Sequence, residues 1–179
     1  FDRAGVPVLH AFGRHTGVLR NLIIAWKERG RADLTSNLAA FLKPLVPTGA
    51  LLVPVPTRPA ARRARGECVV TALSREVAQT CQALMHAKQS TDQTRVQVGE
   101  RAGNVDQTLR TKASALPILV NAVNAHRPLV VIDDIYTTGS TAREAIRALH
   151  CADVQVTAVV VLAAAGNDRW RTAAHRTSV

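Results

Sequence analysis

The sequence has few aromatic residues and no long apolar run. Aromatic side chains make up 3% of the 179 residues, so the core has to be built mainly from Val, Leu, Ile and Ala. Hydrophobic residues still amount to 47%, which favours one globular domain over a disordered or fibrous chain. No apolar run could cross a bilayer, and the N-terminus does not form a signal peptide, so we expect a cytoplasmic protein. Because the chain begins at Phe1 rather than Met, we also expect residues upstream of it.

Cysteine and histidine offer no recognisable metal site. The three cysteines, Cys68, Cys81 and Cys151, are widely spaced and include no CxxC pair, which predicts reduced thiols and no zinc ribbon. His10 and His15 have no third ligand nearby, so we interpret them as structural or surface residues.

Acidic residues are the minority among the charged ones. Only 13 Asp and Glu residues stand against 23 Lys and Arg residues, which gives a net charge of +10. Such an excess favours polyanionic partners, either nucleic acid or polyphosphorylated small molecules, and does not choose between them.

The hydrophobic pattern predicts an α/β fold. Apolar residues at helical spacing predict helices at 17–29, 34–45, 70–84, 114–125 and 140–150. Continuous apolar runs predict buried parallel strands at 50–55, 129–132 and 154–162. We expect a single domain with an open, mostly parallel central sheet flanked by helices, a core of about 17–165 and a basic tail at 166–179. In such sheets ligands bind beyond the carboxyl ends of the strands, where loops 54–66 and 133–141 begin.

The run VVIDDIYTTGST, residues 130–141, carries the most chemistry. A tight loop rich in hydroxyl groups, with Gly139 for close approach and a helix start behind it, can bind a phosphate group through backbone N–H groups. Asp133 and Asp134 would repel that phosphate, so we expect them to face sugar hydroxyls or a divalent cation. A ribose 5-phosphate satisfies both halves. The alternative is an ordinary strand end with an Asp helix cap.

At these residues the chain resembles the type I phosphoribosyltransferases. VVIDDIYTTGST looks like their phosphoribosyl-pyrophosphate signature. The rest of the chain resembles one branch, the competence-related ComF family, over about 17–163. The segments that carry this second resemblance are GVLRNLIIAWKERGR, LLVPVPTRPAARRARG and the later residues Gln93, Arg101, Asn104 and Val105.

The resemblance implies a phosphoribosyltransferase fold with a small hood or flap region, and a role for each matching residue. Asp133 and Asp134 would contact the ribose hydroxyls and support Mg²⁺ indirectly, without direct protein ligands to the metal. The 5-phosphate would be held by Thr137, Thr138, Gly139, Ser140 and Thr141. Thr57 and Arg58 would begin the pyrophosphate loop. Arg95 and Arg101 would lie in a flap over the reacting centre, within a polar stretch, 86–112, that has no clear periodicity.

The sequence departs from the family pattern at two points. ComF relatives usually continue Arg-Gly into Phe-Asn-Gln, whereas Glu67-Cys68-Val69 follows here. The last predicted strand ends in Leu162-Ala163-Ala164, where an Arg is common in the family.

Two functions are compatible with this pattern. The first is a Mg²⁺-dependent phosphoribosyltransferase that acts on phosphoribosyl pyrophosphate and an unidentified base or amine. The second is a non-catalytic ComF-like protein that binds nucleic acid in DNA uptake or processing. Single-stranded DNA would then meet the basic cluster Arg58, Arg62, Arg63 and Arg65, which can equally be a solvated face or a pyrophosphate site.

Overall fold

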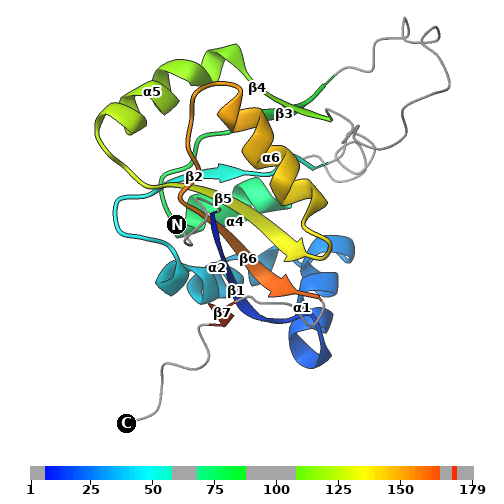
Figure 1. The fold of residues 1–179 in the computed structure, drawn as a ribbon. Coiled ribbons are helices and arrows are strands. Elements are labelled where there is room, and N and C mark those ends of the chain that lie inside the picture. The colour runs from blue at the N-terminus through cyan, green and yellow to red at the C-terminus, as the bar shows by residue number, and fades with distance from the viewer. Residues whose placement is uncertain (1–6, 58–67, 88–107, 166–170, 173–179) are drawn as a thin grey trace, which may run out of the picture.

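The protein is built on a parallel sheet. The computed structural model describes residues 7–57, 68–87, 108–165 and 171–172. Its main sheet has five strands in the order β2-β5-β6-β1-β7, and every pairing in it is parallel (Figure 1). The strands are β1 (Val8–Arg14), β2 (Leu51–Pro54), β5 (Leu129–Tyr136), β6 (Ala158–Ala164) and the short β7 (Arg171–Thr172). The predicted α/β architecture with a mostly parallel sheet is therefore confirmed.

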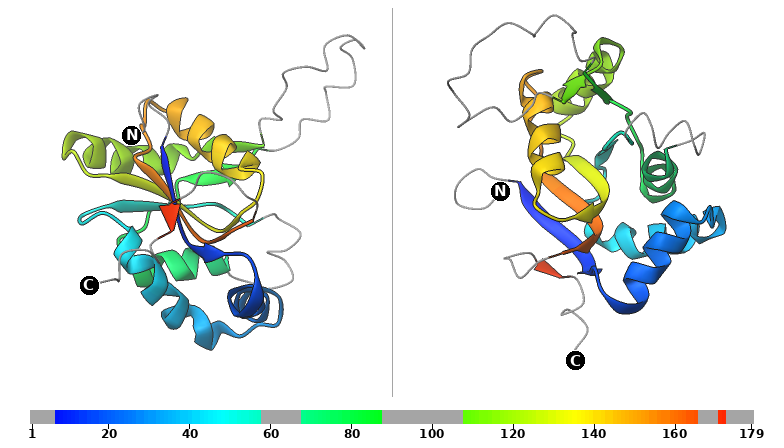
Figure 2. Two further views of the ribbon diagram at one scale, coloured as in Figure 1. Left: turned by 60° about the horizontal axis from the view of Figure 1, so that its bottom comes forward. Right: turned by 90° about the vertical axis from the view of Figure 1, so that its right-hand side faces the viewer.

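Helices cover both faces of this sheet (Figure 2). The helices are α1 (Gly17–Glu28), α2 (Thr35–Leu42), α4 (Val69–Val77), α5 (Leu116–Asn124) and α6 (Ser140–His150), with short 3-10 turns at Ala32–Leu34, Lys43–Leu45 and Ala113–Ala115. Helices α1, α2 and α4 pack on one face, and α5 and α6 pack on the other. Among the described helices none combines the length and apolarity that crossing a membrane requires.

The central strands are apolar on both sides because each face meets a helical layer. All residues of β2 and β6 are buried, as are Leu129 to Ile132 of β5. Along β5, Leu129 and Val131 belong to the core beneath α5 and α6, whereas Val130 and Ile132 belong to the core beneath α1, α2 and α4. Alternate residues of the strand thus enter different cores.

The structure corrects four of the expected boundaries. Strand β1 was not predicted, because VLHAFGR is not a continuous apolar run, and it extends the sheet beyond the expected start of the core at 17. Strand β5 continues through both aspartates to Tyr136 instead of ending at 132. Strand β6 begins at Ala158, later than the expected 154.

The fourth correction concerns the helix expected at 70–84, which ends at Val77. The chain then runs beside β2: the Leu52 N–H donates to the Gln79 carbonyl and the Cys81 N–H donates to the Leu52 carbonyl, at 2.9 and 2.8 Å. These bonds satisfy backbone groups at the edge of the sheet and replace the last helical turns. Leu84 accordingly starts a strand rather than ending a helix.

A small antiparallel pair, β3 (Leu84–His86) and β4 (Leu109–Thr111), stands beside α6. Glu144 of α6, 4% exposed, accepts the Leu109 N–H at 2.9 Å and pairs with Arg147 at 2.7 Å. Arg147 in turn donates to the Leu109 carbonyl at 2.7 Å. One buried carboxylate therefore attaches β4 to the helix that follows the acidic strand.

Glu144→Ala is expected to lower the free energy of unfolding by about 2–4 kcal/mol, because it leaves the Leu109 N–H and the Arg147 guanidinium without their partner. Urea titration followed by circular dichroism measures this. Glu76→Ala, at an exposed position of α4, is the matched control and should change stability by less than about 0.5 kcal/mol. Equal stabilities of the two variants would contradict the prediction.

Candidate functional site

The two segments singled out from the sequence leave the same edge of the main sheet. Strands β2 and β5 are parallel neighbours, paired from Leu51↔Leu129 to Pro54↔Ile132, so their carboxyl ends coincide. The Val55 N–H continues the pairing by donating to the Ile132 carbonyl at 3.0 Å. The start of loop 54–66 and the whole of 133–141 therefore lie where parallel sheets bind ligands.

The two aspartates of β5 have different environments. Asp134 is buried; its Oδ1 accepts the Ile135 N–H at 2.8 Å, and its Oδ2 forms an ion pair with Lys27 of α1. Asp133 is half-buried, and its Oδ1 accepts the Asp134 N–H at 2.9 Å. The Asp133 side chain also lines the pocket at the loop, where a ligand can meet it.

The loop after the aspartates has the backbone of an anion site. Gly139 adopts φ 75° as the N-cap of α6 and has no side chain to cap the helix, while the Ser140 N–H donates to the Thr138 hydroxyl at 3.4 Å. In the described part of the chain the N–H groups of Thr141 and Ala142 have no acceptor, whereas the Arg143 N–H already bonds the Gly139 carbonyl at 2.9 Å. Free N–H groups at the positive end of a helix attract anions.

Side chains hold this loop in shape. The Thr138 hydroxyl lies 3.2 Å from that of Ser140, and Arg143 donates to the Thr138 carbonyl at 3.0 Å. Thr137, Thr138, Ser140 and Thr141 are exposed, so their hydroxyl groups are accessible to a ligand. The structure therefore brings the predicted phosphate-loop residues together at the start of one helix.

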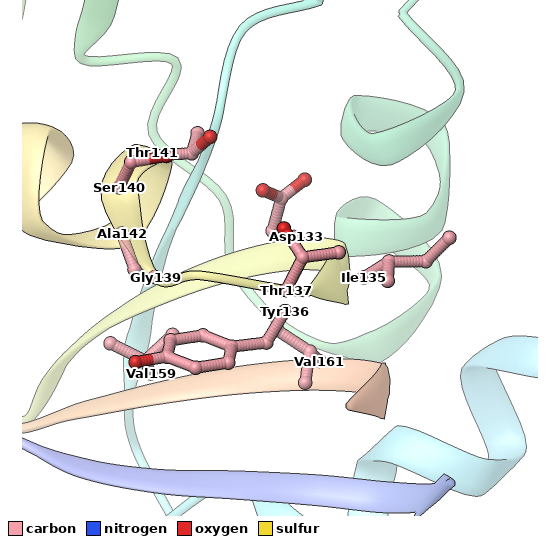
Figure 3. A pocket seen from close by; sticks show the side chains of 10 residues that line it. All are labelled: Asp133, Ile135, Tyr136, Thr137, Gly139, Ser140, Thr141, Ala142, Val159 and Val161. Carbon is pink, nitrogen blue, oxygen red and sulfur yellow. The ribbon is translucent and has the colours of Figure 1, made fainter. Parts of the chain in front are cut away.

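Tyr136 is partly buried and packs against the core beneath the loop. A Cβ atom on Gly139 would lie only 2.2 Å from the Tyr136 hydroxyl oxygen, so the ring and the glycine are in close contact. The pocket lined by both residues, by Asp133 and by Val159 holds about 20 Å³, which is room for about one water molecule (Figure 3). A phosphate group bound by the loop therefore contacts its outer rim unless Tyr136 moves.

The predicted pyrophosphate loop is described only at its two ends. Thr57 Oγ1 lies 2.9 Å from Cys68 Sγ, so these residues close the segment between them. His86 Nε2 contacts the carbonyls of Pro56 and Thr57, both at 3.2 Å, and so connects the end of β3 to the start of this loop. The remaining predicted residues lie outside the described part of the chain: Arg58, Arg62, Arg63, Arg65, Gln93, Arg95, Arg101, Asn104 and Val105.

Burial and neighbouring charge shift the pKa values of two groups at this edge. Burial and the adjacent Asp134 raise the pKa of Asp133 to about 8, and Lys27 opposes this only in part. Burial acts to raise the pKa of the Cys68 thiol, but hydrogen bonds from Thr57 and Thr71 outweigh it and bring that pKa below its ordinary value. A proton is thus held on the acidic pair, where it can be displaced by a cation.

Three residues at this edge were not identified from the sequence. Lys27 belonged to the polar side of a predicted helix, Arg143 followed the loop signature, and His86 stood at the start of the unpatterned polar stretch. Of these three, only Lys27 could have been suspected from the sequence, since it lies within the segment that resembles the ComF family. Its contact with Asp134 depends on how α1 packs on the sheet, and the sequence does not contain that information.

Metal ligands are scarce at this edge. Among residues 7–57, 68–87 and 108–165, no three His, Cys, Asp or Glu side chains are grouped to hold a metal ion. The Asp133 side chain is partly exposed, whereas Asp134 Oδ2 is paired with Lys27. A divalent cation here would have one carboxylate and would take its other ligands from water or from a bound substrate, as Mg²⁺ commonly does.

Comparison with known proteins found no matching family model and no matching curated protein. The ComF resemblance thus stays a prediction, and the functional argument depends on the geometry of this edge.

Asp133→Asn should remove a pH dependence of stability. The folded protein keeps a proton on Asp133 up to about pH 8, while the unfolded chain releases it near the ordinary value of 3.8. Between these values the folded state binds more protons, so the wild type should lose stability relative to Asp133→Asn as pH rises from 4 to 8. Urea titrations of both proteins across this range measure the difference, and parallel curves would contradict the raised pKa.

Gly139→Ala should destabilise the protein and abolish phosphate binding, because the new methyl group would strike the Tyr136 ring. Gly49→Ala is the matched control: Gly49 has a similar φ of 74°, and nothing lies within 4 Å of its added Cβ. The control should cost about 1–2 kcal/mol for the left-handed backbone alone and leave phosphate affinity unchanged. Thermal unfolding and ³¹P NMR titration with inorganic phosphate distinguish the two, and equal behaviour would refute the contact.

Proposed function

We propose that this protein is a ComF-like type I phosphoribosyltransferase, which binds phosphoribosyl pyrophosphate and transfers ribose 5-phosphate to a base or amine with the help of Mg²⁺. One observation carries the proposal: the partly exposed Asp133 side chain lines the same pocket as Gly139, Ser140 and Thr141 at the start of α6, at a single sheet edge. A phosphorylated sugar needs both a polar acceptor for its hydroxyl groups and donors for its phosphate.

The geometry supports separate roles for the two parts of the site. The N–H groups of Thr141 and Ala142 and the hydroxyl groups of 137–141 would bind the 5-phosphate. Asp133 Oδ2 would accept a hydrogen bond from a ribose hydroxyl and so fix the ring relative to the phosphate. Thr57, which follows the neighbouring strand, would begin the part of the site that receives pyrophosphate.

Transfer at ribose C1 needs charge stabilisation more than a nucleophile. The bond to pyrophosphate breaks as positive character develops on the ring, and the arriving nitrogen forms the new bond to C1 while pyrophosphate leaves with the electron pair. The carboxylate of Asp133 would stabilise that positive character. Mg²⁺, when bound, would neutralise the departing negative charge, with substrate and water as its ligands and with Asp133 and Asp134 supporting it indirectly.

The nucleic-acid alternative depends on Arg58, Arg62, Arg63 and Arg65. These residues lie outside the described part of the chain, so the alternative stays a prediction. The few aromatic residues also provide little for stacking of single-stranded bases.

Isothermal titration calorimetry with phosphoribosyl pyrophosphate and Mg²⁺ tests the proposal. At about pH 9, above the pKa of about 8 that Asp133 has in the folded protein, the wild type should bind, and Asp133→Asn should bind at least about tenfold more weakly, because it loses a charged hydrogen-bond acceptor for the sugar. Asp153→Asn, which changes an exposed acid beyond the far end of α6, is the matched control and should bind like the wild type.

Two results would contradict parts of the proposal. Absence of binding by the wild type, or equal binding by Asp133→Asn, would reject the ligand assignment. Release of pyrophosphate on addition of candidate bases or amines then tests the transfer reaction itself, and binding without release from any acceptor would favour a sensor.

A further inference from the structure

The ion pair between Lys27 and Asp134 joins a helix outside the loop signature to the ligand edge. The Asp134 side chain is 6% exposed and that of Lys27 is 34% exposed, so the pair lies at the boundary between core and solvent. Lys27 occupies the last turn of α1, directly after Trp26, which is 1% exposed and donates its Nε1–H to Thr35 at 3.0 Å. The packing of Trp26 therefore fixes where Lys27 reaches.

The end of α1 is equally well defined. Gly30 follows it in the left-handed conformation, at φ 70°, and the Arg31 N–H returns to the Ala25 carbonyl at 3.2 Å. Lys27 accordingly stands on a helix that is anchored both by a buried side chain and by a closed end. Its contact with Asp134 is a property of the folded core and does not depend on a flexible surface loop.

The charges at this edge of the sheet explain why the ion pair between Lys27 and Asp134 matters for anion binding. Two carboxylates, Asp133 and Asp134, precede a loop whose free N–H groups attract anions. Like charges so close to a bound phosphate would oppose it. Lys27 contributes the opposite charge on the face of β5 that α1 covers, while Asp133 lines the loop pocket.

We propose that Lys27 is a positioning residue for anion binding: by pairing with Asp134 it cancels the negative charge of that carboxylate beside the loop and so allows a phosphate group to bind there. This inference rests on the proposed phosphate site at 137–141. It adds that a positive charge on α1 is needed for phosphate to bind there. Lys27 acts through Asp134 and needs no contact with the ligand.

The net charge beside the loop predicts the order of phosphate affinities among the wild type and three variants. Relative to the wild type, Lys27→Met adds one net negative charge beside the loop, Asp134→Asn removes one, and the double variant restores the original sum. One unit charge within about 8–10 Å of a phosphate, at an effective dielectric constant of about 20, corresponds to roughly tenfold or more in affinity. Inorganic phosphate is the suitable probe because it has no sugar hydroxyl groups for the aspartates to contact.

The experiment is a ³¹P NMR titration of the four proteins with inorganic phosphate at constant pH and low salt. Lys27→Met should bind about tenfold more weakly than the wild type, Asp134→Asn about tenfold more tightly, and the double variant within about twofold of the wild type. These differences should shrink when the ionic strength is raised from about 0.05 M to about 0.5 M, which a purely structural role of Lys27 would not produce.

Arg20→Met is the matched control, since it removes one positive charge from an exposed position of the same helix. It should bind within about twofold of the wild type, because the charge of an exposed side chain is screened by solvent and salt. Lys27→Arg keeps the charge and should also retain phosphate binding.

Several outcomes would overturn the inference. If Lys27→Met binds phosphate as the wild type does, Asp134 does not need neutralisation; if the double variant binds as weakly as Lys27→Met, Lys27 contacts the phosphate itself. Should Lys27→Met fail to fold, as circular dichroism would show, the double variant is compared with Asp134→Asn, and equal affinities refute the inference. A wild type that binds neither phosphate nor phosphoribosyl pyrophosphate would instead reject the proposed function together with the inference.

Discussion

The arrangement of this protein depends on one electrostatic constraint: two adjacent carboxyl groups follow the stretch of β5 that is buried on both faces. A buried carboxylate without a partner is costly, and two neighbouring ones repel each other. The structure stabilises the two in different ways. Asp134 accepts a backbone N–H and pairs with the ammonium group of Lys27. Asp133 accepts one backbone N–H, and its pKa is raised to about 8, so it holds a proton below that pH.

This difference follows from strand geometry. Consecutive residues of β5 enter different cores, so the helices on either side of the sheet meet different members of the pair. Helix α1 covers one face and supplies Lys27, while the chain leading into α6 places a helix start on the pocket side of the strand. A single eight-residue strand thereby separates a structural carboxylate from one that is accessible to a ligand.

Most of this fold could be predicted from the sequence where the pattern was local. The helix at 140–150 was confirmed as Ser140–His150, and the apolar runs at 50–55 and 129–132 do form parallel neighbours. The failures have a common physical origin. Helix α4 ends early because residues 79–81 bond to Leu52, and β1 becomes a strand only because β6 and β7 pair with it.

The candidate site shows the same difference between features set by local sequence and features set by long-range packing. The phosphate loop is contiguous in sequence, so its residues could be identified together, whereas Lys27 and Asp134 are separated by about a hundred positions and meet only through the packing of Trp26 and α1. A loop signature therefore defines which groups face a ligand but not the net charge that the ligand meets. In a chain of net charge +10 the general attraction for polyanions acts at long range, whereas the charge next to the loop depends on whether Asp134 is paired with Lys27.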